Sequence, residues 1–227
     1  MHDTLRNNQA LRDLFSDFAE QSNTLVVAPL FPAGLDTPDD LDHYKYLRFR
    51  DIRYDEIVVR IVEEVGSRYR VDAVHFSLFG FSGGAHFAHR FLYVEPARLA
   101  RVVVASPGSV TLPAEEHRWW PGLGDFASVF GHPVDWEALK RVPTHLIVGE
   151  QDTNPGGTIQ SREHPNWVDG ADAAGRNRVE RLRALHAGLA RRGAAVTFEE
   201  IPGAAHEIGP VVQAAIRFLS APAMPRS

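Results

Sequence analysis

The stretch of sequence that decides the fold is Val74-His75-Phe76-Ser77-Leu78-Phe79-Gly80-Phe81-Ser82-Gly83-Gly84-Ala85-His86-Phe87. An apolar run rich in aromatic residues leads into a G-x-S-x-G motif, and a helical pattern follows at once. The stretch therefore predicts a buried strand, a tight turn and a helix, with Ser82 at the apex. Such a turn strains the serine backbone and lifts its hydroxyl above the sheet. We interpret Ser82 as a candidate nucleophile, and a purely structural glycine-rich turn is the alternative.

Length and composition indicate a globular protein. The 227 residues suit one α/β domain, so we expect a single domain over residues 1–227. A net charge of −5 argues against a nucleic-acid partner, and the lack of a run of about 18 apolar residues argues against a membrane partner. Cysteine is absent, which excludes disulfides and a cysteine nucleophile. The polar start, Met1–Asn8, has no secretory signal core, so we predict a cytoplasmic protein.

Strands and helices are predicted to alternate along the chain. Hydrophobic periodicity indicates helices over roughly residues 8–21, 57–65, 83–95, 174–192 and 208–219. Short apolar runs predict strands at 25–30, 74–79, 101–105 and 144–149, and the alternating run 195–201 predicts an outer strand. The acidic run Asp36–Asp42 lacks the spacing of a calcium loop and is interpreted as a solvated loop. This order predicts a mostly parallel sheet covered by helices on both faces.

Two further strand ends carry the residue types that a serine nucleophile needs. Asp152 follows one strand directly, and His206 lies in a small-residue loop after the next. A histidine would take the serine proton, and an aspartate would hold the imidazole in the correct tautomer. Asp152 as a turn cap and His206 as a helix cap are the alternatives. Asp169 and Asp172 are rival acids, but they lie deep in a loop and are the weaker choice.

His86 and His89 are three residues apart on the helix after Ser82, a spacing that could suit a metal. No third ligand is evident nearby, so we interpret both as packed or solvated side chains and predict no metal site.

The serine turn, the aspartate turn and the histidine loop together resemble the α/β-hydrolase superfamily, and Gly80–Arg90 followed by Gly149–Asp152 is similar to its small bacterial esterases and depolymerase-like members. The resemblance runs from about Leu25 to the C-terminal helix. It implies a three-layer fold with Ser82, Asp152 and His206 as the catalytic triad and no cofactor.

The same resemblance implies an oxyanion hole made of two backbone N–H groups. One belongs to Gly83, and the other belongs to a loop that commonly opens with His-Gly. Here His2-Asp3-Thr4 stands at that place, which points to the Thr4 N–H on a loosely held terminus. The superfamily's strand before this loop is missing, so the 25–30 and 74–79 strands must pair directly or leave unpaired backbone groups. We therefore expect that the natural protein starts upstream of Met1, in which case a signal peptide could precede it.

Residues 106–142 stand where the superfamily places a lid or cap. Four aromatic side chains are candidates for lining a substrate pocket: Trp119, Trp120 and Phe126 in this segment, and Trp167 beyond it. A small satellite core under a long loop is the alternative.

The expected function is a serine hydrolase that cleaves small-molecule carboxylic esters through an acyl-enzyme, without metal or cofactor. The same triad acting on an amide, a thioester or a carbon–carbon bond is a second interpretation. A non-catalytic binding protein with an α/β-hydrolase-like fold is a third.

Overall fold

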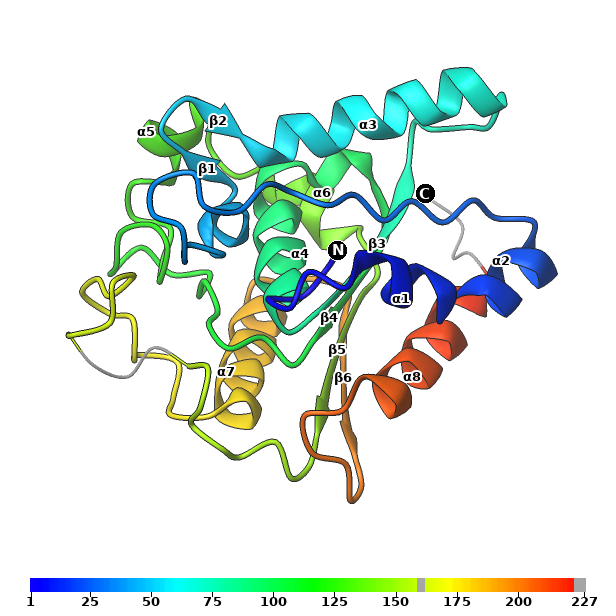
Figure 1. Cartoon of the computed structure of the whole chain (residues 1–227). Helices are drawn as coiled ribbons and strands as arrows, with labels where there is room; N and C mark the ends of the chain where they lie inside the picture. Colours follow the sequence, from blue (N-terminus) through cyan, green and yellow to red (C-terminus); the bar gives the residue numbers. More distant parts are fainter. Residues whose placement is uncertain (159–161, 223–227) are drawn as a thin grey trace.

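A four-stranded parallel sheet forms the centre of the computed structural model, which describes residues 1–158 and 162–222 (Figure 1). The strands follow one another in the order β3-β4-β5-β6. Their bounds are Phe76–Phe81, Leu99–Ala105, Thr144–Gly149 and Val196–Ile201. A short antiparallel pair, β1 (Arg48–Phe49) and β2 (Ile52–Arg53), lies apart from this sheet.

Helices cover both faces of the sheet and give it three layers (Figure 1). One face carries α4 (Gly83–Val94) and α7 (Arg178–Arg191), and the other carries α8 (Ile208–Ser220). The remaining helices are α1 (Asn8–Asp13), α2 (Ser16–Ser22), α3 (Tyr54–Tyr69), α5 (Phe126–Phe130) and α6 (Trp136–Lys140), with 3-10 turns η1 (His43–Tyr46) and η2 (Pro96–Arg98). Among the described residues, no helix is both long and apolar enough to cross a lipid bilayer.

Two apolar cores lie on opposite sides of the sheet. On the α4 and α7 side, Phe87 and Leu182 are fully buried with Val102 and Val104 of β4. On the α8 side, Val103 and Ala105 of the same strand pack with Val211. Successive residues of β4 therefore supply both cores, because side chains of a strand alternate between its faces. This explains why the sequences of the central strands are unbroken apolar runs.

The strand predicted at Leu25–Leu30 is wrong. The segment is irregular, and Leu25, Val27 and Leu30 are exposed by 48%, 40% and 49%. It crosses between α3 and α1 in Figure 1 and pairs with no strand in the described part of the chain. A strand needs a hydrogen-bonding partner, and here a groove of about 1000 Å³ separates the segment from β3.

That groove, called the β3-edge groove below, has mainly apolar walls. Val26 lines one side, Phe76 and Leu78 of β3 line another, and Val58 and Val62 of α3 complete it. Of the two expected outcomes, direct pairing or unpaired backbone groups in the core, direct pairing does not occur, and β3 lies at the edge of the sheet.

The other predicted elements agree with the structure apart from their bounds. The helix predicted over residues 8–21 is divided into α1 and α2 at Leu14–Phe15, where Phe15 is buried against Phe79. The strand before Ser82 extends to Phe81. The outer position predicted for 195–201 is confirmed, since β6 is the last strand of the sheet.

Candidate active site

Ser82 lies in a sharp turn between β3 and α4, as the motif predicts. Its φ of 52° and ψ of −115° are strained for a residue with a side chain. The Ser82 N–H donates to the Ala105 carbonyl at 2.9 Å, which anchors the turn to the neighbouring strand. A Cβ added to Gly80 would lie 2.1 Å from the Gly84 carbonyl oxygen, so the crossing of strand and helix requires glycine there.

The carboxyl ends of β3, β5 and β6 bring Ser82, Asp152 and His206 together. His206 Nε2 lies 3.1 Å from Ser82 Oγ, and His206 Nδ1 lies 2.7 Å from Asp152 Oδ2. These distances allow one continuous hydrogen-bond chain in which neutral His206 donates from Nδ1 to the carboxylate and accepts the serine proton at Nε2. The rival Asp169 lies elsewhere, with its carboxylate 3.9 Å from His117.

The Asp152 turn and the His206 loop are packed together by a glycine. The Gln151 N–H donates to the Ala204 carbonyl at 2.8 Å. A Cβ added to Gly149 would lie 2.3 Å from the Ala205 carbonyl oxygen. Gly149 is therefore required for a close approach between the end of β5 and the loop that carries His206.

Asp152 is 1% exposed, and its carboxylate contacts two charged partners, with the Ser106 side chain as a further neighbour. Oδ2 accepts from His206, and Oδ1 accepts from Arg178 Nη1 at 3.2 Å. Burial on its own raises the pKa of Asp152, but the hydrogen bond from His206 and the nearby charges outweigh it, so the pKa lies below its ordinary value. Asp152 is therefore a charged carboxylate at neutral pH. His206 itself is partly open to solvent, with 32% of its side chain exposed.

Gly83 and Thr4, the two predicted oxyanion donors, lie next to each other. A Cβ added to Gly83 would lie 2.8 Å from the Thr4 nitrogen and 2.6 Å from Tyr44 Oη. The first turn of α4 thus packs directly on the Thr4 backbone beside Ser82. Helix N-termini favour negative charge, so this is a suitable place for an oxyanion.

The segment that carries Thr4 is firmly held, and the expectation of a loosely held terminus is wrong. Met1, His2 and Asp3 are all buried. The Tyr44 hydroxyl donates to the His2 carbonyl at 3.1 Å, and the Phe31 N–H donates to His2 Nε2 at 3.3 Å. The segment is held by contacts with residues distant in sequence, which the sequence pattern does not reveal.

No protein-family model and no curated protein matches the chain. Solved structures do match. LpqC, a poly(3-hydroxybutyrate) depolymerase from Bordetella parapertussis, is 24% identical with a TM-score of 0.77, over 100% of this chain and 80% of that one. Poly(aspartic acid) hydrolase-1 from Sphingomonas sp. KT-1 is 23% identical with a TM-score of 0.75, over 95% and 84%. An S-formylglutathione hydrolase from Agrobacterium tumefaciens is 15% identical with a TM-score of 0.59, over 93% and 78%.

The fold is the α/β-hydrolase fold. At these identities the likeness establishes the architecture, while the chemistry depends on the side chains of this chain.

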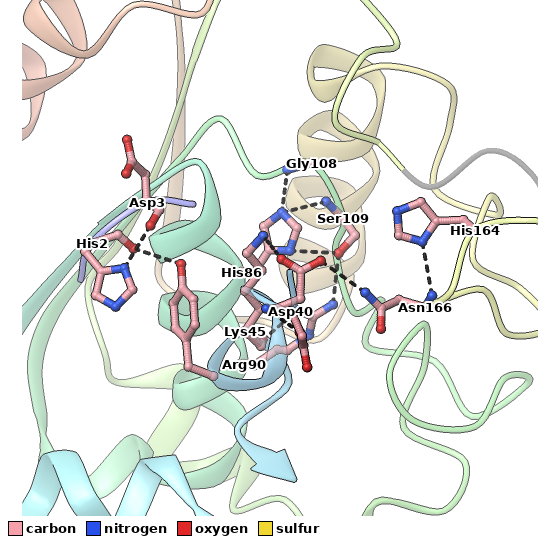
Figure 2. Close-up of polar contacts among 12 residues, drawn as sticks. His2, Asp3, Asp40, Lys45, His86, Arg90, Gly108, Ser109, His164 and Asn166 are labelled. Atoms are coloured by element: carbon pink, nitrogen blue, oxygen red, sulfur yellow. Dashed lines mark hydrogen bonds and ion pairs between the residues drawn. The ribbon is translucent and has the colours of Figure 1, made fainter. Parts of the chain in front are cut away.

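In this α/β-hydrolase fold, a buried polar network supports the loop that follows β4. His86 Nε2 accepts from the Gly108 and Ser109 N–H groups at 2.8 and 3.1 Å (Figure 2). Arg90 donates to Thr111 Oγ1 and to the Lys45 carbonyl. His86 accordingly has a packing role, in agreement with the interpretation of His86 and His89 as packed side chains.

His89 is equally occupied, since its Nε2 accepts from the Thr111 N–H at 3.0 Å and its Nδ1 lies 2.7 Å from the Ala85 carbonyl. Burial lowers the pKa of His89 well below its ordinary value, and the Arg90 charge acts in the same direction. A neutral ring with Nδ1 as donor and Nε2 as acceptor fits both contacts.

The four predicted pocket aromatics belong to packed clusters. Phe126 is 3% exposed and lies in the main core with Trp119 against it, while Trp120 is 5% exposed in a satellite core with Trp119 and Trp167 packed beside it. Their arrangement matches the satellite-core alternative, and a contribution to substrate binding stays a prediction. Apart from α5 and α6, residues 106–142 are irregular.

Arg178 is the site residue that sequence reasoning missed. The sequence offered one signal, because Arg178 stands four residues before Leu182 and so falls in line with the apolar face of α7. A charged residue on a buried helix face requires a buried partner, and that partner is Asp152.

Proposed function

We propose that the chain is a serine hydrolase that cleaves carboxylic esters through an acyl-enzyme. The observation that carries this proposal is the hydrogen-bond chain from Ser82 through His206 to Asp152, with Ser82 at a strained strand–helix turn. Hydrolase activity recurs among the fold neighbours described above, which are a depolymerase and two hydrolases.

In the first half of the reaction, Ser82 Oγ attacks the ester carbonyl while His206 Nε2 takes its proton. The carbonyl oxygen becomes an oxyanion that accepts from the Gly83 and Thr4 N–H groups. The imidazolium then gives its proton to the departing alkoxide, and an acyl-serine remains.

In the second half, water attacks the acyl-serine. His206 takes a proton from that water and returns it to Ser82 Oγ as the second tetrahedral intermediate collapses. The acid leaves, and the enzyme regains its starting state. Asp152 holds the ring and stabilises the positive charge that His206 carries in both halves.

The test is hydrolysis of short-chain p-nitrophenyl esters by the wild-type chain, Ser82→Ala and Ser77→Ala. Ser77 is an exposed serine of β3, so its alanine variant is a matched control. We expect turnover in the wild type and in Ser77→Ala, and only background hydrolysis in Ser82→Ala.

Covalent labelling by a fluorophosphonate separates this proposal from a non-catalytic binding protein. Labelling that disappears in Ser82→Ala supports an activated serine. Absence of both labelling and turnover in the folded wild type would contradict the proposal. Labelling without ester turnover would instead direct the search to amides, thioesters or carbon–carbon bonds.

A further inference from the structure

Arg178 is a buried cation in direct contact with the acid of the proposed triad. Its Nη1 donates to Asp152 Oδ1 at 3.2 Å, and its side chain is 9% exposed against 1% for that of Asp152. The two oxygens of the carboxylate are thus divided between two partners, His206 on Oδ2 and Arg178 on Oδ1.

The surroundings of Arg178 fix its guanidinium in place. It is the first residue of α7, and the Asn177 side chain caps this helix by accepting from the Glu180 N–H. A Cβ added to Gly157 would lie 2.5 Å from Arg178 Nη2, so the loop after Asp152 packs directly on the guanidinium. The Gly157 carbonyl in turn packs against Gly108, since a Cβ there would lie 2.2 Å from it.

We propose that Arg178 is a positioning residue of the active site: it fixes the Asp152 carboxylate for His206 and keeps that carboxylate charged in a buried environment. This role rests on the proposed function, because it concerns the same triad.

The physical reason is the cost of burying a charge. A carboxylate removed from water favours its neutral form unless hydrogen bonds and opposite charges stabilise the ion. The charged groups that contact Asp152 come from two directions, His206 from the loop after β6 and Arg178 from α7. With the charge of Arg178 removed, His206 is the remaining charged contact, and Oδ1 loses the planar guanidinium that sets the rotation of the carboxylate.

The experiment compares the wild type with Arg178→Gln and Arg178→Lys in p-nitrophenyl ester hydrolysis across pH. Glutamine keeps an amide donor without the charge, and lysine keeps the charge without the planar fork. We expect kcat of Arg178→Gln to fall by about 10–100-fold with little change in KM, a smaller loss than the about 10⁴-fold known for neutralising a triad acid.

The pH profile separates this role from simple loss of structure. In Arg178→Gln the pKa of Asp152 rises because a stabilising positive charge is lost, so the acid limb of kcat should move towards neutral pH. Arg178→Lys should keep the acid limb of the wild type. Arg183→Gln removes an exposed arginine of the same helix, which pairs with Glu200, and should leave both kcat and the limb unchanged.

A second readout does not depend on turnover. The hydrogen-bonded Nδ1–H proton of His206 should give a low-field NMR signal, assigned by its loss in His206→Asn. We expect this signal in the wild type and in Arg178→Lys, and its shift or loss in Arg178→Gln. Arg178→Met replaces Arg178→Gln if the latter does not fold, as judged by thermal denaturation.

A folded Arg178→Gln with wild-type kcat, acid limb and Nδ1–H signal would overturn the inference. A wild type that hydrolyses no ester and is not labelled at Ser82 would instead overturn the proposed function. In that case the NMR signal alone decides whether Arg178 positions the Asp152–His206 pair.

Discussion

At the scale of single residues, Gly80 illustrates how the serine turn depends on the absence of a side chain. In Gly80→Ala the new Cβ would meet the Gly84 carbonyl at 2.1 Å, and neither the strand nor the helix can move without disturbing Ser82. We expect a loss of about 3 kcal/mol or more in the free energy of unfolding, together with loss of esterase activity. Urea denaturation and ester hydrolysis measure the two effects.

Gly209→Ala is the matched control for Gly80→Ala. Gly209 lies near the start of α8 and nothing lies within 4 Å of a Cβ added there. Alanine should leave activity unchanged and stabilise the protein by up to about 1 kcal/mol, because glycine loses more backbone entropy on folding. Equal urea midpoints for the two variants would refute the close-contact explanation.

A substitution of Tyr44 tests the second oxyanion donor while Thr4 itself stays unchanged. Tyr44→Phe removes the hydrogen bond to the buried His2 carbonyl, so the free energy of unfolding should fall by about 1–3 kcal/mol. The Thr4 N–H is then less well held, and kcat should fall by less than the about 10²–10³-fold of a lost oxyanion donor.

Tyr69→Phe is the control for Tyr44→Phe, since Tyr69 is 60% exposed at the end of α3 and should tolerate the change. If Tyr44→Phe hydrolyses esters at the wild-type rate despite its lower stability, Thr4 is not a working donor.

At the scale of secondary-structure elements, α7 depends on its cap. The Asn177 side chain accepts from the Glu180 N–H at 2.9 Å, and Arg178 follows directly. Asn177→Ala should lower the free energy of unfolding by about 1 kcal/mol, whereas Asn177→Ser should retain most of it because serine also caps helices. Thermal denaturation of the three proteins measures this, and equal midpoints for Asn177→Ala and the wild type would contradict it.

The elements also show what the sequence can and cannot predict. The serine turn and the positions of Asp152 and His206 follow from local rules, because each lies just past a strand whose apolar run is plain in the sequence. The 25–30 run has the same composition, yet it forms no strand, because a strand requires a partner edge that composition does not encode.

Contacts between residues that are distant in sequence cannot be predicted from local rules either. Arg178 and Asp152 are separated by a loop, and Tyr44 and His2 are brought together only by the completed fold. The aromatic run at Trp119–Phe126 has the composition of either a pocket or a core, and its burial in packed clusters becomes visible only when neighbours such as Phe130 and Tyr46 are in place.

At the scale of the whole molecule, buried histidines make stability depend on pH. Burial lowers the pKa of His2 to about 4, and it lowers the pKa of His86 and His89 well below the ordinary value; burial also lowers that of His145, against the opposing effect of Glu199. The unfolded chain binds protons at these rings below about pH 6.5, while the folded chain does not. Stability is therefore complete above that pH and falls as the pH decreases towards the folded-state values.

Urea denaturation at about pH 7 and about pH 5 should show this loss, with a slope of roughly 1.4 kcal/mol per pH unit for each neutral buried ring well below pH 6.5. His89→Gln keeps a donor and an acceptor for Ala85 and Thr111 but cannot titrate. The slope of its unfolding free energy against pH should therefore be smaller by the contribution of about one ring. His75→Gln, at an exposed position, should keep the wild-type slope. A stability that does not change over this interval would mean that the rings are protonated in the folded protein.

The pairing of Thr4 with Gly83, and of Ser82 with His206, has a consequence for biosynthesis. The site joins a segment that precedes the whole central sheet in sequence with a loop that follows its last strand, so no emerging fragment that lacks the region after β6 contains a complete set of reactive groups. Turnover should therefore arise only after the region beyond β6 has left the ribosome, and recovery of activity after dilution from urea should report the slowest long-range contacts.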